Sequence, residues 1–377
     1  MKQSKKIGIA MVSFDPTAPG GQSELKTRKD YFKDFITRAE EHFAQQNDEF
    51  DLKMFLAPEY FLAKREDYNY KNPTGNFTGL FKPRKRTITQ QKFDEHQQDI
   101  HEHAEKTIAG NYLVIPGTAL VTQGVFEFTP DSIPFENVAA LLMRSNKRAF
   151  YRKRVAYHEW GTESYKSNIT QYNTFTEQER AQNRRMEKVR TDFIFINGKD
   201  YGLFEVPLGT HDHITVGLEV CADHDGKTLR THLQSKKVDM HIILSAPVDT
   251  QTDAVCARNN GLVVHCSTQL GSRPSLTERD HPGTNVFQAT TDTLVWKAGS
   301  ALEKAKEKST LKEGELEEES ALKKGEVWTF RKKKVTKENH WLPPINSKRQ
   351  KEHLDQFQKE KCNLGAQETI WRVDLLP

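Results

Sequence analysis

The stretch Ile214–Asp223, ITVGLEVCAD, indicates a strand that ends at a cysteine. Its larger apolar residues recur at every second position from Ile214 to Val220, the period of a strand with one apolar face. The residues after Cys221, ADHDG, are polar and do not favour continuation of the strand. A thiol at such a corner, beside acids and a histidine, is placed like a nucleophile.

Two earlier segments supply the groups that a nucleophilic thiol needs. In the first, MFLAPEYF at 54–61, an apolar strand ends at Pro58, and Glu59 follows among aromatic residues. Desolvation shifts a carboxyl group toward its neutral form, which suits a general base or acid. The second, AFYRKRV at 149–155, is a basic cluster that follows the apolar strand Val138–Met143. One cation of this cluster, turned inward, would meet developing negative charge.

Each of these residues also has a purely structural interpretation. A cysteine on an apolar strand usually packs in a core, and we expect this of Cys256 and Cys266. Glu59 would then only cap a turn. Lys153 stands between two arginines, and a solvated basic edge explains it equally well from the residues alone. For Cys221, the corner position favours the nucleophile.

Glu59, Lys153 and Cys221, in this order at strand ends, resemble the nitrilase superfamily, also called the carbon–nitrogen hydrolases. The similarity extends to an opening strand at 7–12, PGTA at 116–119, ENVA at 136–139, YRK at 151–153, GLEVCAD at 217–223, VDMHIILSAP at 238–247 and ARNNGL at 257–262. It covers about residues 5–290, and ordered agreement of this kind is more specific than any single motif.

The resemblance implies a catalytic set in which Cys221 is the nucleophile, Glu59 the base and Lys153 the oxyanion-binding cation. A second glutamate follows the lysine in this superfamily. Glu159 and Glu163 compete for that place, and Glu159 is favoured. Substrate-facing residues are expected to flank the two catalytic strand ends, and these are Tyr60, Ala222, Asp223 and His224. No metal or organic cofactor is implied.

One departure from the superfamily pattern concerns the substrate. Many members carry a proline–glutamate pair a few positions after the cysteine, and this chain has DGKT at 225–228 instead. The resemblance therefore implies the chemistry and leaves the substrate open.

The rest of the chain alternates strand-like and helix-like runs. Strands are predicted at 7–12, 51–56, 113–115, 120–126, 138–143, 240–244, 327–330 and 369–375, and helices at 28–45, 90–109 and 227–235. This alternation favours a layered α/β core. The resemblance, and not the alternation, selects the four-layer αββα sandwich of the nitrilase type.

We predict one domain over residues 1–377 with three insertions. Segment 63–87 is rich in Lys, Arg, Asn, Tyr and Pro and indicates a long loop after Glu59, which would shape the mouth of a site. Segment 163–190 is polar and charged, and a lid is one interpretation of it. Segment 301–324 is almost all Lys, Glu, Ala, Leu and Ser, typical of an exposed helix or a disordered insertion.

Composition limits the class of protein. Of 377 residues, 36% are hydrophobic and 29% charged, as in soluble proteins with an adequate core. The 56 basic and 52 acidic side chains leave a net charge of +4, which gives no global attraction to nucleic acid or anionic membrane. Four cysteines without paired motifs favour a reducing compartment. The apolar run after the basic N-terminus is too short for a signal peptide, so a cytoplasmic protein is expected.

A metal-dependent hydrolase is the first alternative. His211, Asp212 and His213 precede the Cys221 strand, Asp223, His224 and Asp225 follow it, and His101 and His103 flank a glutamate elsewhere. Zinc needs three or four converging ligands, and helical hydrolase motifs place histidines four apart. Here the histidine pairs are two apart, and the pair at 211–213 fits a hairpin turn better. The metal interpretation is weak.

Binding of nucleotides or nucleic acid is weaker still. Gly226-Lys227-Thr228 resembles the end of a P-loop, but Cys221 stands where the pattern requires a glycine. Basic runs at 82–86 and 331–334, the latter near Trp328 and Phe330, are the kind that contact RNA. Such runs are usually solvated edges, so a binding module is only a second hypothesis.

We therefore expect a hydrolase that cleaves a non-peptide amide or carbamoyl-amide bond through a thioester on Cys221. Acyl transfer through the same thioester and a catalytically silent scaffold remain alternatives. The resemblance also implies a homodimer or larger homo-oligomer.

Overall fold

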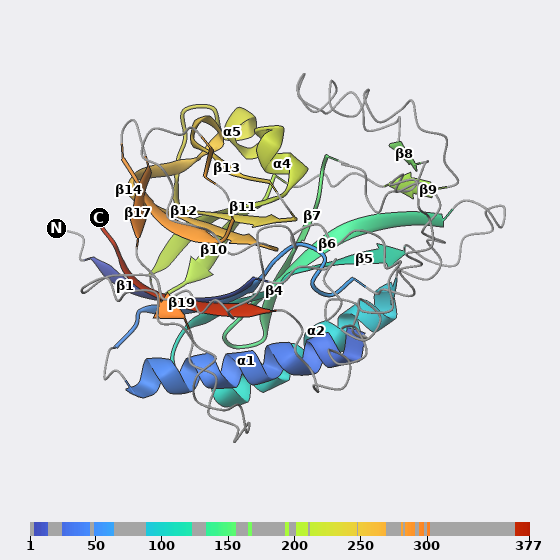
Figure 1. Ribbon diagram of the computed structural model, residues 1–377, viewed down its shortest axis with the longest axis horizontal. Helices are drawn as coiled ribbons and strands as arrows, with labels where there is room; N and C mark the ends of the chain where they lie inside the picture. The colour runs from blue at the N-terminus through green and yellow to red at the C-terminus, as the bar shows by residue number, and fades with distance from the viewer. Residues whose placement is uncertain are drawn as a thin grey trace, which may run out of the picture.

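The computed structural model describes residues 4–13, 25–45, 49–63, 88–122, 133–155, 165–167, 193–195, 201–209, 212–246, 248–268, 280–281, 283–290, 294–297, 300–301 and 366–377. These residues form two large sheets that face each other, with helices on the outer face of each (Figure 1).

The first sheet contains the first and the last described strands of the chain. Its main path runs β18-β19-β1-β2-β4-β6-β5-β3, with β7 and β9 also paired to β6 and β8 paired to β9. Its strands are β1 (Lys5–Ser13), β2 (Leu52–Ala57), β3 (Ile88–Thr89), β4 (Tyr112–Pro116), β5 (Thr118–Thr122), β6 (Ile133–Met143), β7 (Lys147–Arg152), β8 (Tyr165–Ser167), β9 (Phe193–Phe195), β18 (Ser300–Ala301) and β19 (Gln367–Leu375).

The second sheet carries the Cys221 segment. Its order is β10-β11-β12-β14-β16-β17, and its strands are β10 (Leu203–Pro207), β11 (His213–Val220), β12 (Val238–Ser245), β14 (Ala257–Ser267), β16 (Asn285–Ala289) and β17 (Leu294–Lys297). A separate two-stranded pair, β13 (Thr250–Gln251) with β15 (Asp280–His281), lies outside both sheets.

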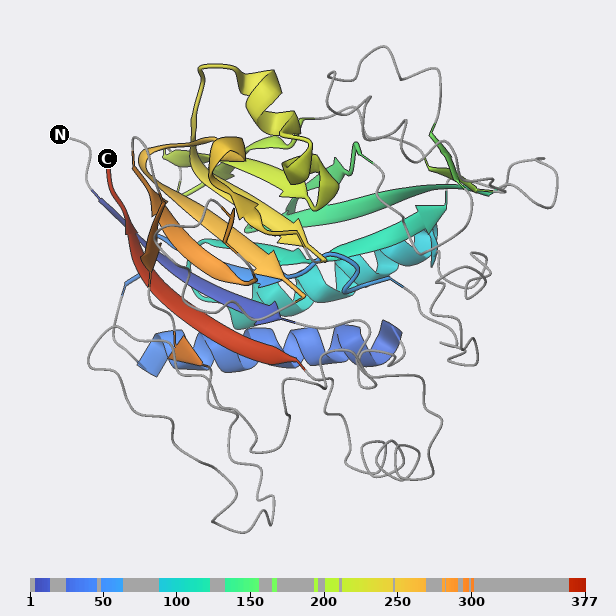
Figure 2. The same cartoon turned by 45° about the horizontal axis from the view of Figure 1, so that its top comes forward.

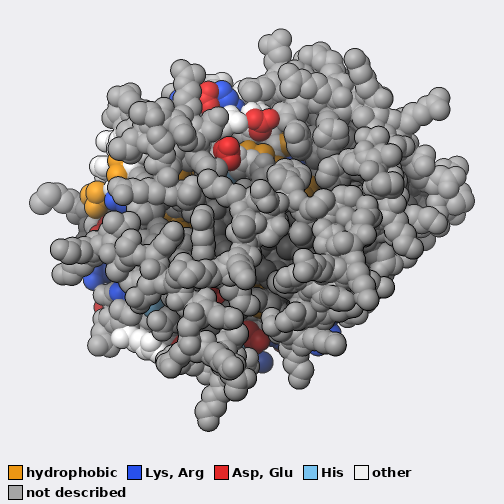
Figure 3. Space-filling model, in the orientation of Figure 1, with side chains coloured by type: hydrophobic (Ala, Val, Ile, Leu, Met, Phe, Trp, Pro, Cys, Tyr) orange, Lys and Arg blue, Asp and Glu red, His pale blue; other side chains and the backbone are white. Residues whose placement is uncertain are grey.

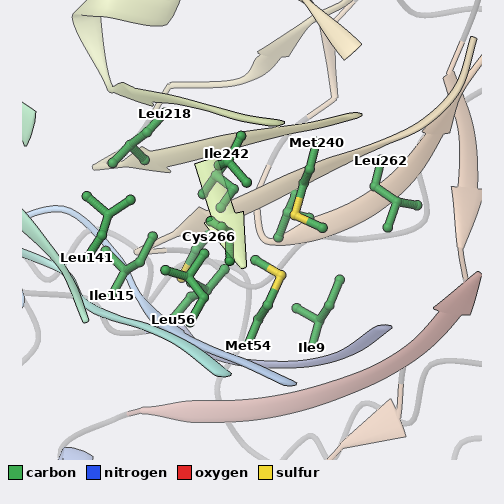
Figure 4. Close-up of a cluster of buried hydrophobic side chains, with 14 of the residues drawn as sticks. Ile9, Met54, Leu56, Ile115, Leu141, Leu218, Met240, Ile242, Leu262 and Cys266 are labelled. Atoms are coloured by element: carbon green, nitrogen blue, oxygen red, sulfur yellow. The ribbon is translucent and has the colours of Figure 1, made fainter. Parts of the chain in front are cut away.

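The main core lies between the sheets and follows from strand alternation. Every second residue of the central strands points inward, so that Met54 and Leu56 of β2 meet Leu218 of β11 and Ile242 of β12 in one buried cluster. Figure 4 shows these side chains facing one another across the gap. Burial of apolar surface on both inner faces holds the two sheets together.

Helices cover the outer faces. α1 (Leu25–Gln45) and α2 (Gln90–Thr107) pack Phe32, Phe35, Phe93 and other residues against the outer side of the first sheet. The short helices α4 (Ala222–Asp225) and α5 (Thr228–Leu233) lie on the other side of the molecule, over the second sheet (Figure 1). The layers are therefore α, β, β, α, and the predicted four-layer fold is confirmed.

The carboxyl ends of β2 and β11 lie at the same edge of the sandwich. Within the sheets, β1 and β2 are parallel, and so are β11, β12 and β14. Across the sheets, the Cys266 sulfur near the end of β14 lies 3.5 Å from the carbonyl oxygen of Val12 near the end of β1. Beside this contact, Ser13 donates a hydrogen bond to Thr284, whose hydroxyl accepts the Ser267 N–H. The strand ends that precede Glu59 and Cys221 therefore lie at the same edge of the sandwich.

Most predicted elements are present with shifted ends. The strands predicted at 7–12, 51–56, 113–115, 138–143, 240–244 and 369–375 correspond to β1, β2, β4, β6, β12 and β19, and the three helices to α1, α2 and α5. The predicted 120–126 strand overlaps β5, which ends at Thr122. The strand at 327–330 lies outside the described residues, as do nearly all of the three predicted insertions and both basic runs.

Two further features of the described residues concern membrane-spanning helices and surface charge. No helix among them is long and apolar enough to cross a membrane. On the face shown in Figure 3, acidic and basic side chains of described residues lie next to each other along the upper edge, as expected when opposite charges nearly cancel.

The inter-sheet core gives a first prediction. Leu56→Ala should lower the free energy of unfolding by about 2–5 kcal/mol, because it removes a fully buried side chain from the centre of the sandwich. The matched control is Leu203→Ala on the edge strand β10, where the side chain is 47% exposed and the change should be within about 0.5 kcal/mol. Chemical denaturation measures both, and equal losses would contradict this packing.

Candidate functional site

The turn after β2 fixes the position of Glu59. Tyr60 adopts φ 63°, and its N–H donates to the hydroxyl of Thr118 at 2.9 Å. The buried guanidinium of Arg28 on α1 donates to the carbonyl of Phe61 at 2.7 Å and also to that of Ala63. Gly117 makes room, because a Cβ there would lie 2.3 Å from the carbonyl oxygen of Pro58.

Glu59 and Lys153 form a buried ion pair. The ammonium Nζ lies 2.8 Å from Glu59 Oε1, and both side chains are fully buried. Asn137 Nδ2 donates to the same carboxylate oxygen at 3.0 Å. Both contacts favour the ionised carboxylate and oppose the desolvation expected from the aromatic surroundings.

The β6–β7 hairpin selects Lys153 from its basic cluster. β7 pairs with β6 up to the contact of Arg152 with Val138, and the N–H of Lys153 then donates to the carbonyl of Asn137 at 2.9 Å. Arg152 is about one-third exposed and binds Glu136 at 3.0 Å. Lys153 is the residue of this basic cluster whose side chain forms an ion pair with Glu59.

Cys221 lies at the junction of β11 and α4 in a strained backbone conformation. Its φ and ψ are 50° and −106°, values that cost a non-glycine residue of order 1–3 kcal/mol. Its N–H donates to the carbonyl of Leu244 on β12 at 2.8 Å, and its own carbonyl accepts the N–H of His224 at 2.9 Å. The thiol is 2% exposed and lies 3.7 Å from the carbonyl oxygen of Ala246. A sharp corner of this kind turns the side chain out of the strand direction at the sheet edge.

Asp223 joins the Cys221 segment to the Lys153 segment. Its carboxylate accepts the hydroxyl of Tyr151 at 2.7 Å and the backbone N–H groups of Arg154 and Val155 at 3.0 and 2.7 Å. Burial raises the pKa of Asp223 to about 7, against the ammonium of Lys153 and these hydrogen bonds, which lower it. Asp223, two residues after Cys221, thus holds the backbone directly after Lys153.

The structure places the other predicted residues as follows. The Lys153 ammonium is 5.9 Å from the centre of the Tyr60 ring, and Ala222 begins α4 directly after the thiol. Asp223 and His224 are fully buried with protein partners, and their predicted contact with a substrate stays a prediction. Glu159 and its alternative Glu163 lie outside the described residues.

Among the described residues, one cluster has metal-ligand geometry: Glu219, His224 and His241, whose ligand atoms lie within 4.8 Å of one another. Hydrogen-bond directions argue against a metal there. His224 Nε2 accepts the N–H of Gln251, and His241 Nδ1 accepts the N–H of Cys256. The nitrogens that face Glu219 must therefore carry the protons. A ligating histidine normally donates from its other nitrogen, so each ring has its proton on the wrong side for a metal.

The histidines weighed from sequence have other partners. Nε2 of His101 and Nε2 of His103 bind the backbone carbonyls of Met143 and Lys33. His213 is the first residue of β11 and pairs with Pro207 of the antiparallel strand β10, so it lies on a strand of the predicted hairpin. His211 lies outside the described residues.

Two other buried thiols have the environment of packing residues. Burial raises the pKa of Cys256 to about 12, and that of Cys266 well above its usual value. A thiolate is the reactive form, so neither is suited to attack a carbonyl. This agrees with the packing role predicted for both.

Three site residues were missed from sequence: Asn137, Glu219 and His241. Asn137 lies in the ENVA segment that was used only to recognise a strand. Glu219 interrupts an apolar strand, and the short helix at 228–233 covers that face. A carboxylate beneath a helix must be buried and paired, and this was the available signal.

The chain was also compared with known proteins. No family model and no curated protein sequence matches it. Solved structures do: Nit3 of Saccharomyces cerevisiae, described as a member of branch 10 of the nitrilase superfamily, is 13% identical with a TM-score of 0.38 over 78% of this chain and 89% of that one. An amidase from Nesterenkonia sp. is 11% identical with a TM-score of 0.38 over 78% and 86%. A CN-hydrolase superfamily protein from Xanthomonas campestris is 11% identical with a TM-score of 0.37 over 78% and 87%.

The buried ion pair gives a second prediction. Lys153→Met should lower the free energy of unfolding by about 3–5 kcal/mol, because it leaves the Glu59 carboxylate buried without its cation. The double variant Lys153→Met with Glu59→Gln should recover most of this loss. The surface pair Lys26–Asp30 is the control, and Lys26→Met should leave stability almost unchanged. Additive losses in the double variant would show that the two side chains do not interact.

The third prediction concerns acid stability. Although burial opposes it, hydrogen bonds from His224 and His241 lower the pKa of Glu219 from 4.5 to about 2. A carboxylate with a depressed pKa contributes stability that is fully present above pH 4.5 and is lost as the pH falls toward 2. The loss should be on the order of 3 kcal/mol. Glu219→Gln should flatten the dependence in this window, and Glu205→Gln, at an exposed carboxylate, should not. Urea titrations at several pH values measure it, and parallel curves for wild type and Glu219→Gln would refute it.

Proposed function

We propose that this protein hydrolyses a non-peptide carbon–nitrogen bond, of the amide or carbamoyl-amide type, with Cys221 as nucleophile. The observation that carries the proposal is the fully buried Glu59–Lys153 pair at the sandwich edge where β11 delivers Cys221 on a strained corner. A thiol, an acid–base group and a cation are the parts that acyl transfer through a thioester requires, and Asp223 links the Cys221 segment to the Lys153 segment.

The first half of the reaction forms the thioester. Glu59 takes the thiol proton as the sulfur attacks the carbonyl carbon, and a carbon–sulfur bond forms. The Lys153 ammonium and the backbone N–H of Ala222 hold the resulting oxyanion, each such donor being worth about 3 kcal/mol of barrier. The carbon–nitrogen bond then breaks, and the departing amine takes the proton from Glu59.

The second half returns the enzyme to its starting state. Glu59 takes a proton from water, the hydroxide attacks the thioester carbonyl, and the same two donors hold the second oxyanion. The carbon–sulfur bond breaks, the carboxylic acid leaves, and the thiolate recovers its proton from Glu59. In this scheme Asn137 orients the carboxylate, and Glu159 would orient Lys153 or the substrate.

The fourth prediction tests the nucleophile. Incubation with a panel of amides should give a covalent acyl adduct, and peptide mass spectrometry should locate it at Cys221. Cys221→Ala should lower turnover by at least about a thousandfold, because it removes the sulfur that forms the proposed thioester. Iodoacetamide should inactivate the protein, and a metal chelator should not.

Cys256→Ala is the matched control, because this thiol is buried and has a raised pKa. It should keep full turnover. Turnover that survives in Cys221→Ala would overturn the proposal, and loss of activity in chelator would favour a metal enzyme. An adduct that an added amine releases faster than water does would assign acyl transfer in place of hydrolysis.

A further inference from the structure

Two buried carboxylates flank Cys221 at equal distance along the chain, and the proposed reaction uses neither. Asp223, two residues after the thiol, holds the Lys153 segment. Glu219, two residues before it, is also fully buried but points elsewhere. Leu218 and Val220 face the inter-sheet core, so the alternation of β11 puts Glu219 on the outer face, beneath α4 and α5. It is separated from the site by the strand itself.

Four donors converge on the Glu219 carboxylate. Oε2 accepts from Nδ1 of His224 at 2.8 Å and from Nε2 of His241 at 3.0 Å. Oε1 accepts the hydroxyl of Thr228 at 3.1 Å and the N–H of Leu229 at 2.8 Å. One side chain of β11 thereby binds α4, α5 and the neighbouring strand β12.

The direction of each hydrogen bond in this cluster is fixed. Backbone N–H groups occupy the far nitrogen of both histidines, from Gln251 for His224 and from Cys256 for His241. Each ring therefore has one tautomer and one orientation. The hydrogen-bond directions are fixed because the other tautomer of either ring would bring two N–H donors together.

This cluster acts on the strained residue. His224 donates its backbone N–H to the carbonyl of Cys221 while its ring is held by Glu219. The Cys221 N–H is held by Leu244 of β12, the strand that also carries His241. Both sides of the Cys221 peptide backbone are thus tied to elements that Glu219 fastens together. A residue at φ 50° keeps that conformation only when its surroundings impose it.

We propose that Glu219, bound by His224 and His241, is a positioning residue that holds Cys221 in the strained backbone conformation that the proposed attack by its sulfur requires. The proposal rests on the proposed function in one respect, that Cys221 is the nucleophile. The carboxylate itself touches no reacting atom.

Glu219→Gln is the informative variant. A carboxamide has one oxygen and one NH2 group, so its NH2 must face either the two histidines or Thr228 and Leu229, all of which are donors here. A change of tautomer does not relieve the conflict at His224, because its Nε2–H would then oppose the N–H of Gln251. Thr228→Val is a milder second variant that removes one donor and keeps the side-chain shape.

Glu40→Gln is the control for stability alone. Glu40 is a buried carboxylate of the first sheet's outer layer, paired with Lys53 at 2.6 Å and remote in the fold from α4. It should destabilise the protein without altering the thiol.

Three measurements test the proposal, each at a temperature where every variant is folded. The first is the rate of Cys221 alkylation by iodoacetamide, followed on the peptide, and the second is amide hydrogen exchange over 221–225. The third is kcat and KM with an amide that the protein turns over. Glu219→Gln should slow alkylation by at least about tenfold, accelerate exchange in this turn, and lower kcat by about a hundredfold with KM within about twofold. Thr228→Val should change each in the same direction by less than about threefold.

The outcomes separate this proposal from the function. Wild-type alkylation and exchange in a folded Glu219→Gln variant would overturn the positioning role while leaving the chemistry of Cys221 in place. Equal effects in Glu40→Gln would also overturn it, because they would reflect stability alone. If Cys221→Ala keeps turnover, the proposed function fails, and alkylation and exchange still decide whether Glu219 holds the turn.

Discussion

The site depends on an ion pair whose two side chains are fully buried. Two charges taken out of water are costly unless each is paired and hydrogen-bonded in good geometry. The Glu59–Lys153 contact at 2.8 Å meets this condition only because Asn137 supplies a further donor and because both backbones are held. Arg28 and Thr118 fix the turn that carries the glutamate, and Asp223 fixes the segment that carries the lysine. The buried pair thus depends on these surrounding polar contacts.

The sandwich explains how residues so far apart in sequence come together. Parallel strands within each sheet place their carboxyl ends at one edge, and the contact between the ends of β1 and β14 places the two edges side by side. The Leu56, Leu218 and Ile242 side chains fix the distance between the sheets. A core of tightly packed apolar residues is a suitable support for such a site because it resists small displacements.

The sequence was sufficient for what depends on period and order. Alternation predicted β1, β2 and β11, and the apolar face of α1 was visible in its Phe residues. The motif order proposed Glu59, Lys153 and Cys221 as the catalytic set. The sequence did not predict strand register, and it did not predict which elements pack against the outer face of a strand. From the residues alone, Arg152, Lys153 and Arg154 are equivalent; the resemblance selected Lys153, and in the structure its ammonium contacts Glu59. Asp223 and Glu219 are symmetric about the cysteine, yet one faces the Lys153 loop and the other the outer helices. A local sequence pattern does not predict the different surroundings of Asp223 and Glu219, because these surroundings depend on which element packs against each face of the strand.

The pairing of Glu59 with Lys153 also has a consequence for charge during the proposed reaction. Before attack, the pair is neutral and the thiol is neutral, so the buried site carries little net charge to destabilise it. Transfer of the thiol proton to Glu59 removes the carboxylate charge and leaves the ammonium uncompensated at the moment when the oxyanion forms. The positive charge that had been bound by the base then becomes available to the new anion. The net charge of the site does not change, and in a medium of low dielectric this avoids the large cost of creating an isolated charge. In the proposed reaction one ion pair therefore supplies first the base and then the oxyanion partner.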